Sequence, residues 1–202
     1  MDPRIKSEGP GGNVNPHHTI AGIDEAGRGP LAGPVVAAAV ILREPIEGLN
    51  DSKQLTEKRR LALATQIRET ALVGVGLAEP EEIDRINILQ ATMTAMRRAA
   101  LQLGTIPQEF RIDGNRTPDG LPAPARFIIG GDATDPAISA ASIIAKTVRD
   151  ALMIRAAERF PHYGFEGHKG YAARAHLDAI AEHGPCPIHR MSFSPMRLPT
   201  LV

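Results

Sequence analysis

Residues 35–42, with the sequence VVAAAVIL, are the longest strongly apolar run in the chain. Eight residues are far too few to span a bilayer, whereas an unbroken apolar run of this length is typical of a β-strand covered on both faces. Such a strand requires helices on both sides of its sheet. The run therefore predicts an α/β fold, with a mixed sheet flanked by helices.

Periodicity locates the other elements of this fold. Val73, Val75 and Leu77 alternate as in a strand, and Thr56 stands where it can cap the helical pattern that follows it. Pro80 is favoured at the start of a helix. We expect strands at residues 19–24, 35–42, 73–77, 110–113 and 126–130, and helices at residues 56–70, 87–103, 137–160 and 172–183, with a further helical start near residue 80.

The organisation of the chain is that of one domain. Residues 1–18 contain Gly, Pro and Asn throughout and no apolar periodicity, so we expect a flexible N-terminal tail. Residues 19–202 contain no internal repeat and no linker, so we expect a single domain that ends in a helical segment. The aromatic content is only 3%, so the core must be built from aliphatic side chains and methionine.

Charge and cysteine usage narrow the function classes. The 23 basic and 23 acidic residues cancel, so a nucleic-acid binder would need a local basic patch, and residues 139–202 are the basic end of the chain. The one cysteine in the sequence, Cys186, excludes an intramolecular disulfide and fits a reducing compartment, so we expect a cytoplasmic protein. His183, Cys186 and His189 are evenly spaced, but without paired cysteines they are a poor zinc site.

Acidic residues stand where three predicted strands end, at Asp24 and Glu25, at Asp113 and at Asp132. Functional residues of open α/β sheets gather at strand ends, and carboxylates on neighbouring strands can meet there. A cluster of buried carboxylates favours bound Mg²⁺ or Mn²⁺, and two such ions suit phosphoryl chemistry. The alternative is that these are ordinary turn carboxylates, since Asp is common in turns.

The sequence around these acids resembles bacterial ribonuclease HII, and the resemblance covers nearly everything after the tail. It begins at Asp24 with DEAGRGPLAGP and recurs in family order. The further strings are DSKQL at residues 51–55, IDGN at 112–115, GD at 131–132, ISAASIIAKTVRD at 138–150, YGFEGHKGY at 163–171 and EHGPCPIHRMSFSP at 182–195. Several distinctive strings in one order make a chance match implausible.

The resemblance implies a ribonuclease H-like fold with a five-stranded mixed sheet. It also implies hydrolysis of the RNA strand of RNA/DNA hybrids and cutting on the 5′ side of a single ribonucleotide embedded in duplex DNA. Water is then the nucleophile, the products carry a 3′-hydroxyl and a 5′-phosphate, and two Mg²⁺ or Mn²⁺ ions are bound with the substrate. We expect a monomer. The family's four metal-binding carboxylates match Asp24, Glu25, Asp113 and Asp132, with Asp135 lying close to the last of these.

The resemblance also implies a set of substrate-binding residues. Gly27, Arg28 and Gly29 match the element that reads the ribonucleotide, and Tyr171 matches the tyrosine at the RNA-to-DNA junction. Glycines allow the main chain to approach a 2′-hydroxyl closely, and an aromatic ring can stack on a nucleotide. Phosphate contacts are expected from Lys53, Ser142, Lys146, His168 and Lys169.

Some alternatives remain open at this point. Arg149 and Asp150 are as well suited to a structural ion pair as to substrate contact. Ala173 and Met191 stand where the family commonly has Thr and Arg, which would weaken peripheral contacts. A nuclease of the same fold with another substrate, or a catalytically silent nucleic-acid-binding module, would show the same elements.

Overall fold

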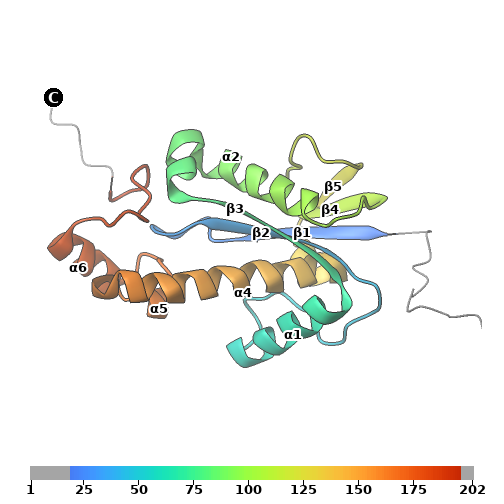
Figure 1. Ribbon diagram of the computed structural model, residues 1–202, viewed down its shortest axis with the longest axis horizontal. Coiled ribbons are helices and arrows are strands. Elements are labelled where there is room, and N and C mark those ends of the chain that lie inside the picture. The colour runs from blue at the N-terminus through green and yellow to red at the C-terminus, as the bar shows by residue number, and fades with distance from the viewer. Residues whose placement is uncertain (1–18, 197–202) are drawn as a thin grey trace, which may run out of the picture.

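A five-stranded mixed sheet forms the centre of the protein in a computed structural model that describes residues 19–196 (Figure 1). The strand order is β3-β2-β1-β4-β5. The antiparallel part pairs β1 with β2 and β2 with β3, and the parallel part pairs β1 with β4 and β4 with β5. The strands are β1 Ile20–Ala26, β2 Val35–Ile41, β3 Leu72–Ala78, β4 Glu109–Asp113 and β5 Ala125–Ile128. The predicted α/β class and mixed five-stranded sheet are confirmed.

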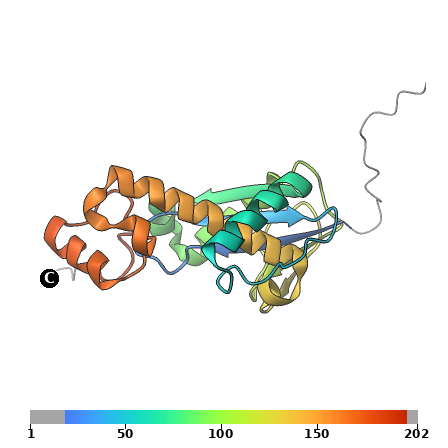
Figure 2. The same cartoon turned by 90° about the horizontal axis from the view of Figure 1, so that it is seen from below.

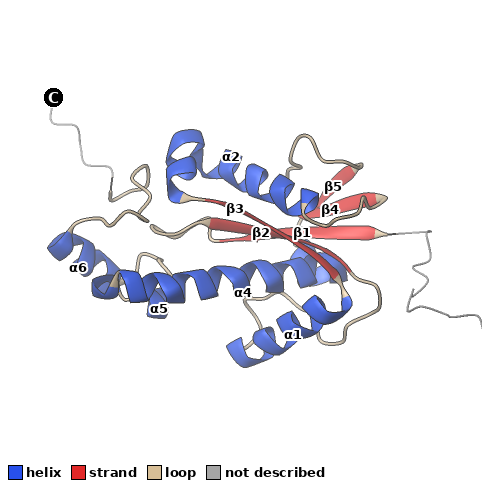
Figure 3. Cartoon of the chain, viewed as in Figure 1, coloured by secondary structure: helices blue, strands red, loops and turns tan. Residues whose placement is uncertain are grey.

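The apolar run forms β2, and every residue of Val35–Ile41 is buried. Alternate side chains of β2 enter two different cores, so Ala37 packs with α2 (Pro80–Leu101), whereas Ala38 packs on the side of α1 (Glu57–Thr70) and α4 (Pro136–Arg159). Figures 1 and 3 show these helices on opposite faces of the sheet. The strand is thus covered on both faces, as its composition predicts.

The helix ends follow their capping residues. The backbone N–H of Arg59 donates to Thr56 Oγ1 at 3.3 Å, so Thr56 is the predicted N-cap of α1. Asp135 caps α4 by accepting from the N–H groups of Ala137 and Ile138 at 2.9 and 3.2 Å. The first turn of α4 lies so close to β1 that a Cβ at Gly22 would collide with the backbone of residues 137 and 138.

Helix α2 joins the two helical segments expected on either side of residue 87. Asn87 has a φ of 66° and interrupts the helical backbone, and its Oδ1 accepts from the N–H groups of Leu89 and Gln90 at 3.0 and 3.2 Å. The side chain therefore caps the second segment at a kink. The helix ends at Leu101, two residues before the predicted end.

Other boundaries differ from the prediction where short elements carry no periodicity. Strand β5 ends at Ile128 because the chain turns through Gly130, at a φ of 67°, into the four-residue helix α3 (Gly131–Thr134). The short helices η1 (Pro161–Tyr163) and α5 (Phe165–His168) were not predicted. The last helix, α6 (Arg174–His183), begins two residues later than expected.

The elements after α4 form the predicted C-terminal helical segment at one end of the molecule (Figure 2). Tyr163 and Phe165 lie in a small separate core there, together with Ala32 and Met153. In the part of the chain that the structure describes, no helix is long and apolar enough to cross a membrane. The predicted tail, residues 1–18, lies outside the described residues.

Candidate active site

Three carboxylates meet at the ends of neighbouring elements. Strands β1 and β4 are parallel neighbours with Ile23 opposite Ile112, so Asp24 and Asp113 follow side by side. Asp132 reaches them from α3, and its N–H donates to Asp113 Oδ1 at 3.3 Å. One oxygen from each of the three side chains lies within 4.8 Å of the others. The carboxylates are therefore close enough to share an ion.

Glu25 lies beside this group. The Asp24 side chain and the charge of Asp113 both act on the pKa of Glu25, so its carboxylate lies close to them. The Glu25 carboxylate accepts from the Arg28 guanidinium at 3.3 Å. The structure thus brings together three of the four predicted metal-binding carboxylates and places the fourth next to them.

The electrostatics of the group are those of a cation site. Asp24 is 4% exposed, and burial, followed by the charges of Glu25 and Asp113, raises its pKa well above the ordinary value. Burial also raises the pKa of Glu25 and of Asp132, and the charge of Asp113 adds to both effects. A divalent cation would favour the ionised carboxylates. The all-oxygen donor set fits Mg²⁺ or Mn²⁺.

A second metal site suggested by sequence spacing is not formed. Among residues 19–196, the trio of Asp24, Asp113 and Asp132 is the one group of three or more His, Cys, Asp or Glu side chains that could hold an ion. His189 Nδ1 instead accepts from the backbone N–H of Cys186 at 2.8 Å.

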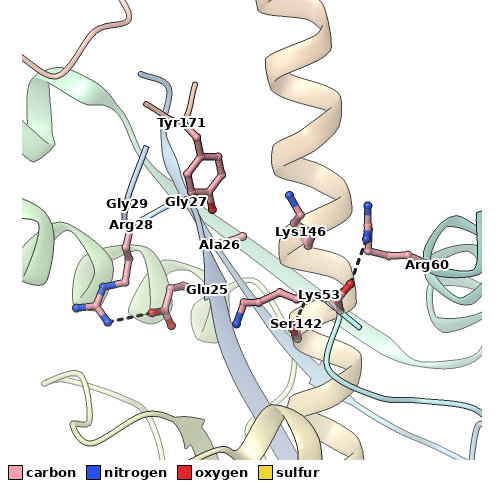
Figure 4. Close-up of a pocket in the computed structure, with 11 residues that line it drawn as sticks. Glu25, Ala26, Gly27, Arg28, Gly29, Lys53, Arg60, Ser142, Lys146 and Tyr171 are labelled. Atoms are coloured by element: carbon pink, nitrogen blue, oxygen red, sulfur yellow. Dashed lines mark hydrogen bonds and ion pairs between the residues drawn. The ribbon is translucent and has the colours of Figure 1, made fainter. Parts of the chain in front are cut away.

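An open pocket of about 440 Å³ adjoins the carboxylates (Figure 4). Figure 4 shows the Glu25 carboxylate directed at the Arg28 guanidinium and the Lys53 side chain extending toward Glu25, with the Tyr171 ring above them. Most of the predicted substrate-binding residues line this pocket, namely Gly27, Arg28, Gly29, Lys53, Ser142, Lys146 and Tyr171. Segments far apart in the sequence therefore assemble one surface.

Lys53 links the pocket to the carboxylates. Its Nζ lies 3.6 Å from Asp132 Oδ2 and 3.9 Å from Asp51 Oδ1, and its side chain is 76% exposed. Although burial works in the opposite direction, the surrounding acids raise the pKa of Lys53. The ammonium is therefore charged and accessible to a phosphate.

The remaining polar residues of the pocket are fixed by one another. Ser142 Oγ donates to Ser52 Oγ at 2.8 Å, and Lys146 Nζ donates to Asp150 at 2.7 Å. Arg60 also donates to Asp150, at 3.4 Å. Asp150 thus takes the structural ion-pair role that the sequence left open, with Lys146 and Arg60 as its partners.

His168 and Lys169, also predicted to bind substrate, do not line the pocket. The His168 ring contacts the Tyr163 carbonyl through Nε2 at 2.8 Å and accepts from the Gly170 N–H through Nδ1 at 3.2 Å, so both ring nitrogens are occupied within the protein. Lys169 Nζ donates to the Glu166 carbonyl. These bonds shape the segment that leads to Tyr171.

Two buried arginines hold the glycine-rich loop of residues 27–34, and sequence reasoning missed this role. Arg190 donates to the carbonyls of Gly27, Arg28, Pro30 and Gly33 at 2.6 to 2.9 Å. Arg149 donates to the carbonyls of Ala32, Pro34 and Lys169 at 3.0 to 3.1 Å. Together they tie the loop to α4 and to the segments on either side of α6.

Neither guanidinium forms a salt bridge within the described chain, although Arg149 is 1% and Arg190 0% exposed. Burial and the neighbouring charge of Arg149 lower the pKa of Arg190 to about 9, and burial lowers that of Arg149. Carbonyl dipoles take the place of counterions. The only signal in the sequence is that both arginines lie inside the strings that resemble the family.

Comparison with known proteins identifies the family of the chain. The Ribonuclease HII family model matches residues 21–196. The ribonuclease HII of Maricaulis maris is 63% identical over 180 residues, covering 88% of this chain and 83% of that protein, and the one from Azoarcus sp. is 59% identical over 181 residues, covering 88% of each. The crystal structure of ribonuclease H2 from Pyrococcus horikoshii matches with a TM-score of 0.74 at 29% identity, covering 89% of this chain and 95% of that chain. The chain therefore belongs to the ribonuclease HII family, the metal-dependent hydrolases of the type 2 ribonuclease H class.

Proposed function

We propose that this ribonuclease H-type endonuclease, besides acting on RNA/DNA hybrids, cuts on the 5′ side of a single ribonucleotide in duplex DNA and leaves a 3′-hydroxyl and a 5′-phosphate. The observation that carries the proposal is the position of the three carboxylates beside a pocket lined by Gly27, Arg28, Gly29 and Tyr171. Arg28, Gly29 and Tyr171 are exposed at this pocket, so main chain and a ring can both contact a single nucleotide there.

Asp24, Asp113 and Asp132 would hold the divalent cations, with Glu25 as a further ligand from the adjoining strand position. We propose two Mg²⁺ or Mn²⁺ ions, which when bound stabilise charge on the phosphate and lower the pKa of water. Three negative side chains and the neighbouring Glu25 provide the charge to balance two divalent ions. Lys53 places a cation on the substrate side of the same group.

The glycine-rich loop would recognise the ribose. Gly27 has a φ of 95°, and Arg190 binds its carbonyl, so the loop has a conformation that favours glycine and is fixed from behind. The main chain of residues 27–29, which lines the pocket, would contact the 2′-hydroxyl, the group that distinguishes RNA from DNA. Arg28, half-exposed at the rim, can bind a phosphate.

Tyr171 would contact the sugar next to the cut. Its ring is 47% exposed, and a Cβ at Gly29 would lie 3.8 Å from the ring, so the ring faces the loop directly. An exposed ring held against a glycine can stack on a nucleotide without losing packing of its own. We also propose that residues 19–202 act as one domain and as a monomer, with Ser142 and Lys146 contacting the phosphate backbone.

A cleavage gel tests the proposal. The substrates are a duplex with one embedded ribonucleotide, the all-DNA duplex of the same sequence and a long RNA/DNA hybrid, each with Mg²⁺, with Mn²⁺ and with chelator. We expect metal-dependent cutting of the first and third substrates only, with the first cut 5′ of the ribonucleotide. Cutting of the hybrid alone would refute the single-ribonucleotide specificity, and binding without any cutting would indicate a silent binding module.

A further inference from the structure

A chain of hydrogen bonds through two buried histidines ends on the main chain of Tyr171. The backbone N–H of Cys186 donates to His189 Nδ1 at 2.8 Å, and His189 Nε2 lies 3.0 Å from His176 Nε2. His176 Nδ1 lies 2.8 Å from the Tyr171 carbonyl oxygen. His176 is 0% and His189 2% exposed, so water does not compete for these bonds.

The shorter contacts of this hydrogen-bond chain fit one arrangement of protons, and His189 Nδ1 also lies 3.3 Å from the Cys186 carbonyl oxygen. A backbone N–H can only donate, so Nδ1 of His189 accepts and its proton is on Nε2. That proton is donated to His176 Nε2, which leaves the His176 proton on Nδ1, directed at the Tyr171 carbonyl. Both rings are neutral in this arrangement, in keeping with burial, which lowers the pKa of His176 and lowers that of His189 to about 4.

The segment that carries Tyr171 depends on such contacts. It lies between α5 and α6, outside any helix or strand, and Tyr171 itself is exposed at the pocket. His168, stacked on His176 with ring centroids 4.5 Å apart, accepts from the Gly170 N–H. The glycine-rich loop and α4 hold the same segment, because the Leu31 N–H donates to the Gly170 carbonyl at 2.8 Å and Arg149 to the Lys169 carbonyl at 3.0 Å, and the histidines add the side-chain contacts nearest Tyr171.

We propose that His176 and His189 are positioning residues that fix Tyr171 over the pocket and thereby set the preference for a single ribonucleotide. This inference rests on the proposed role of Tyr171. A neutral, tautomerically ordered pair holds the Tyr171 carbonyl from the core side, while the ring extends from the same residue toward Gly29. The Tyr171 carbonyl has two donors, His176 and the Ala173 N–H at 2.8 Å, so loss of the His176 bond would loosen the ring and leave the carboxylates in place.

Two substitutions of His176 separate positioning from bulk stability. In His176→Gln the amide lies near the former Nε2, so the contact to His189 survives and the donor to Tyr171 is lost. In His176→Asn the amide lies near the former Nδ1, so the donor to Tyr171 survives. Both changes remove a buried ring of the same size, which makes each the control for the other.

The measurement is the single-turnover rate of the full chain with Mg²⁺ on the one-ribonucleotide duplex, divided by its rate on the long hybrid. We expect His176→Gln to lower this ratio about tenfold, the factor that corresponds to one buried hydrogen bond, and His176→Asn to keep it within about threefold of the wild type. An equal change in the two variants, or no change in either, would overturn the proposal. If the wild type itself does not cut the one-ribonucleotide duplex, the proposed function fails instead.

A nitrogen-15 NMR spectrum of the wild-type imidazoles gives a test that needs no stable variant. At pH 7.5 we expect His176 protonated on Nδ1 only and His189 on Nε2 only, with each signal assigned by coupling to neighbouring protons. A His176 ring protonated on Nε2 or on both nitrogens cannot form the chain described, and that result would contradict the proposal.

Discussion

Asp24 shows how one side chain depends on its surroundings in this protein. Its carboxylate is buried between Glu25 and Asp113, and one backbone N–H, that of Glu25 at 2.7 Å, offsets part of the cost. A buried charged carboxylate destabilises the fold by itself and stabilises it when a cation is bound. Residues of this kind should be needed for catalysis and not for folding.

The first prediction concerns that residue. Asp24→Asn keeps the shape of the side chain and removes a metal ligand, so the cleavage rate should fall by roughly several hundredfold or more. The free energy of unfolding without metal should stay the same or rise, because a buried charge is removed. Cleavage rates and urea titrations measure the two effects, with Asp178→Asn on the exposed face of α6 as the control. A variant with near-normal turnover would refute the assignment of Asp24.

Tyr171 provides a second prediction at the same scale. Tyr171→Ala should reduce cleavage of the one-ribonucleotide duplex about tenfold more than cleavage of long hybrids, because stacking matters most where a single junction must be found. Tyr171→Phe keeps the ring and should stay within about threefold of the wild type on both substrates. Rates on the two substrates, measured side by side, are the readout. Equal losses on both would remove the junction role.

At the scale of elements, the glycine-rich loop is held by hydrogen-bond donors that lie far away in the sequence. The residues that bind its carbonyls, Arg149 and Arg190, come from α4 and from the segment after α6. A loop with so little regular hydrogen bonding of its own depends on these donors for its conformation. The loop and the two arginines should therefore behave as one unit.

The third prediction tests this unit. Arg190→Met leaves the carbonyls of Gly27, Arg28, Pro30 and Gly33 without their donor, so the free energy of unfolding should fall by about 3 kcal/mol. Because the loop and not the carboxylate trio is disturbed, KM for the one-ribonucleotide duplex should rise while Mn²⁺ binding by calorimetry is retained. Arg174→Met, at an 89% exposed side chain, is the matched control. An unchanged KM in the Arg190 variant would show that the loop keeps its conformation without this arginine.

Elements with a clear period were predictable from the sequence, and irregular ones were not. The apolar run of β2 and the caps of α1 and α4 act locally, so their boundaries follow to within one or two residues. The four residues of α3 are too few to show helical spacing, yet they carry Asp132. Glu25 was expected among the acids, and its contact with Arg28 at 3.3 Å was not predicted. The role of Arg190 depends on contacts with residues more than 150 positions earlier, which no local pattern reveals.

At the scale of the molecule, the loop after β1 and the segment after α6 lie side by side. Residues 27–34 follow the first strand, and the segment around His189 follows the last helix, with Ala32 and His189 joined by a β-bridge. The sheet supplies the carboxylates, and the C-terminal segment supplies Tyr171 and the donors behind the loop. The stability of that segment should therefore influence the whole fold.

The fourth prediction is a pH dependence of global stability. His189 is surrounded by His176, Tyr163, Phe165 and Cys186, none of which offers it a negative charge at neutral pH. Its pKa is about 4 in the fold and 6.5 in the unfolded chain, so its contribution is complete above pH 6.5 and is lost as the pH falls toward 4. In urea titrations the free energy of unfolding of the wild type should fall by about 2 to 3 kcal/mol between pH 6.5 and pH 4 because of His189. This part of the fall should be absent in His189→Gln and present in His162→Gln. Equal pH profiles for the wild type and His189→Gln would contradict the burial of a neutral ring.

Gly22 has a consequence for catalysis although it touches no substrate. The hydrogen atom in place of a side chain lets the first turn of α4 lie against β1, and that turn follows directly on α3 with Asp132. Asp24 is two residues farther along the same strand. A methyl group at position 22 would wedge the helix from the strand and widen the gap between two of the ion-binding oxygens. The absence of a Cβ at Gly22 thus helps to set the distance between Asp24 and Asp132.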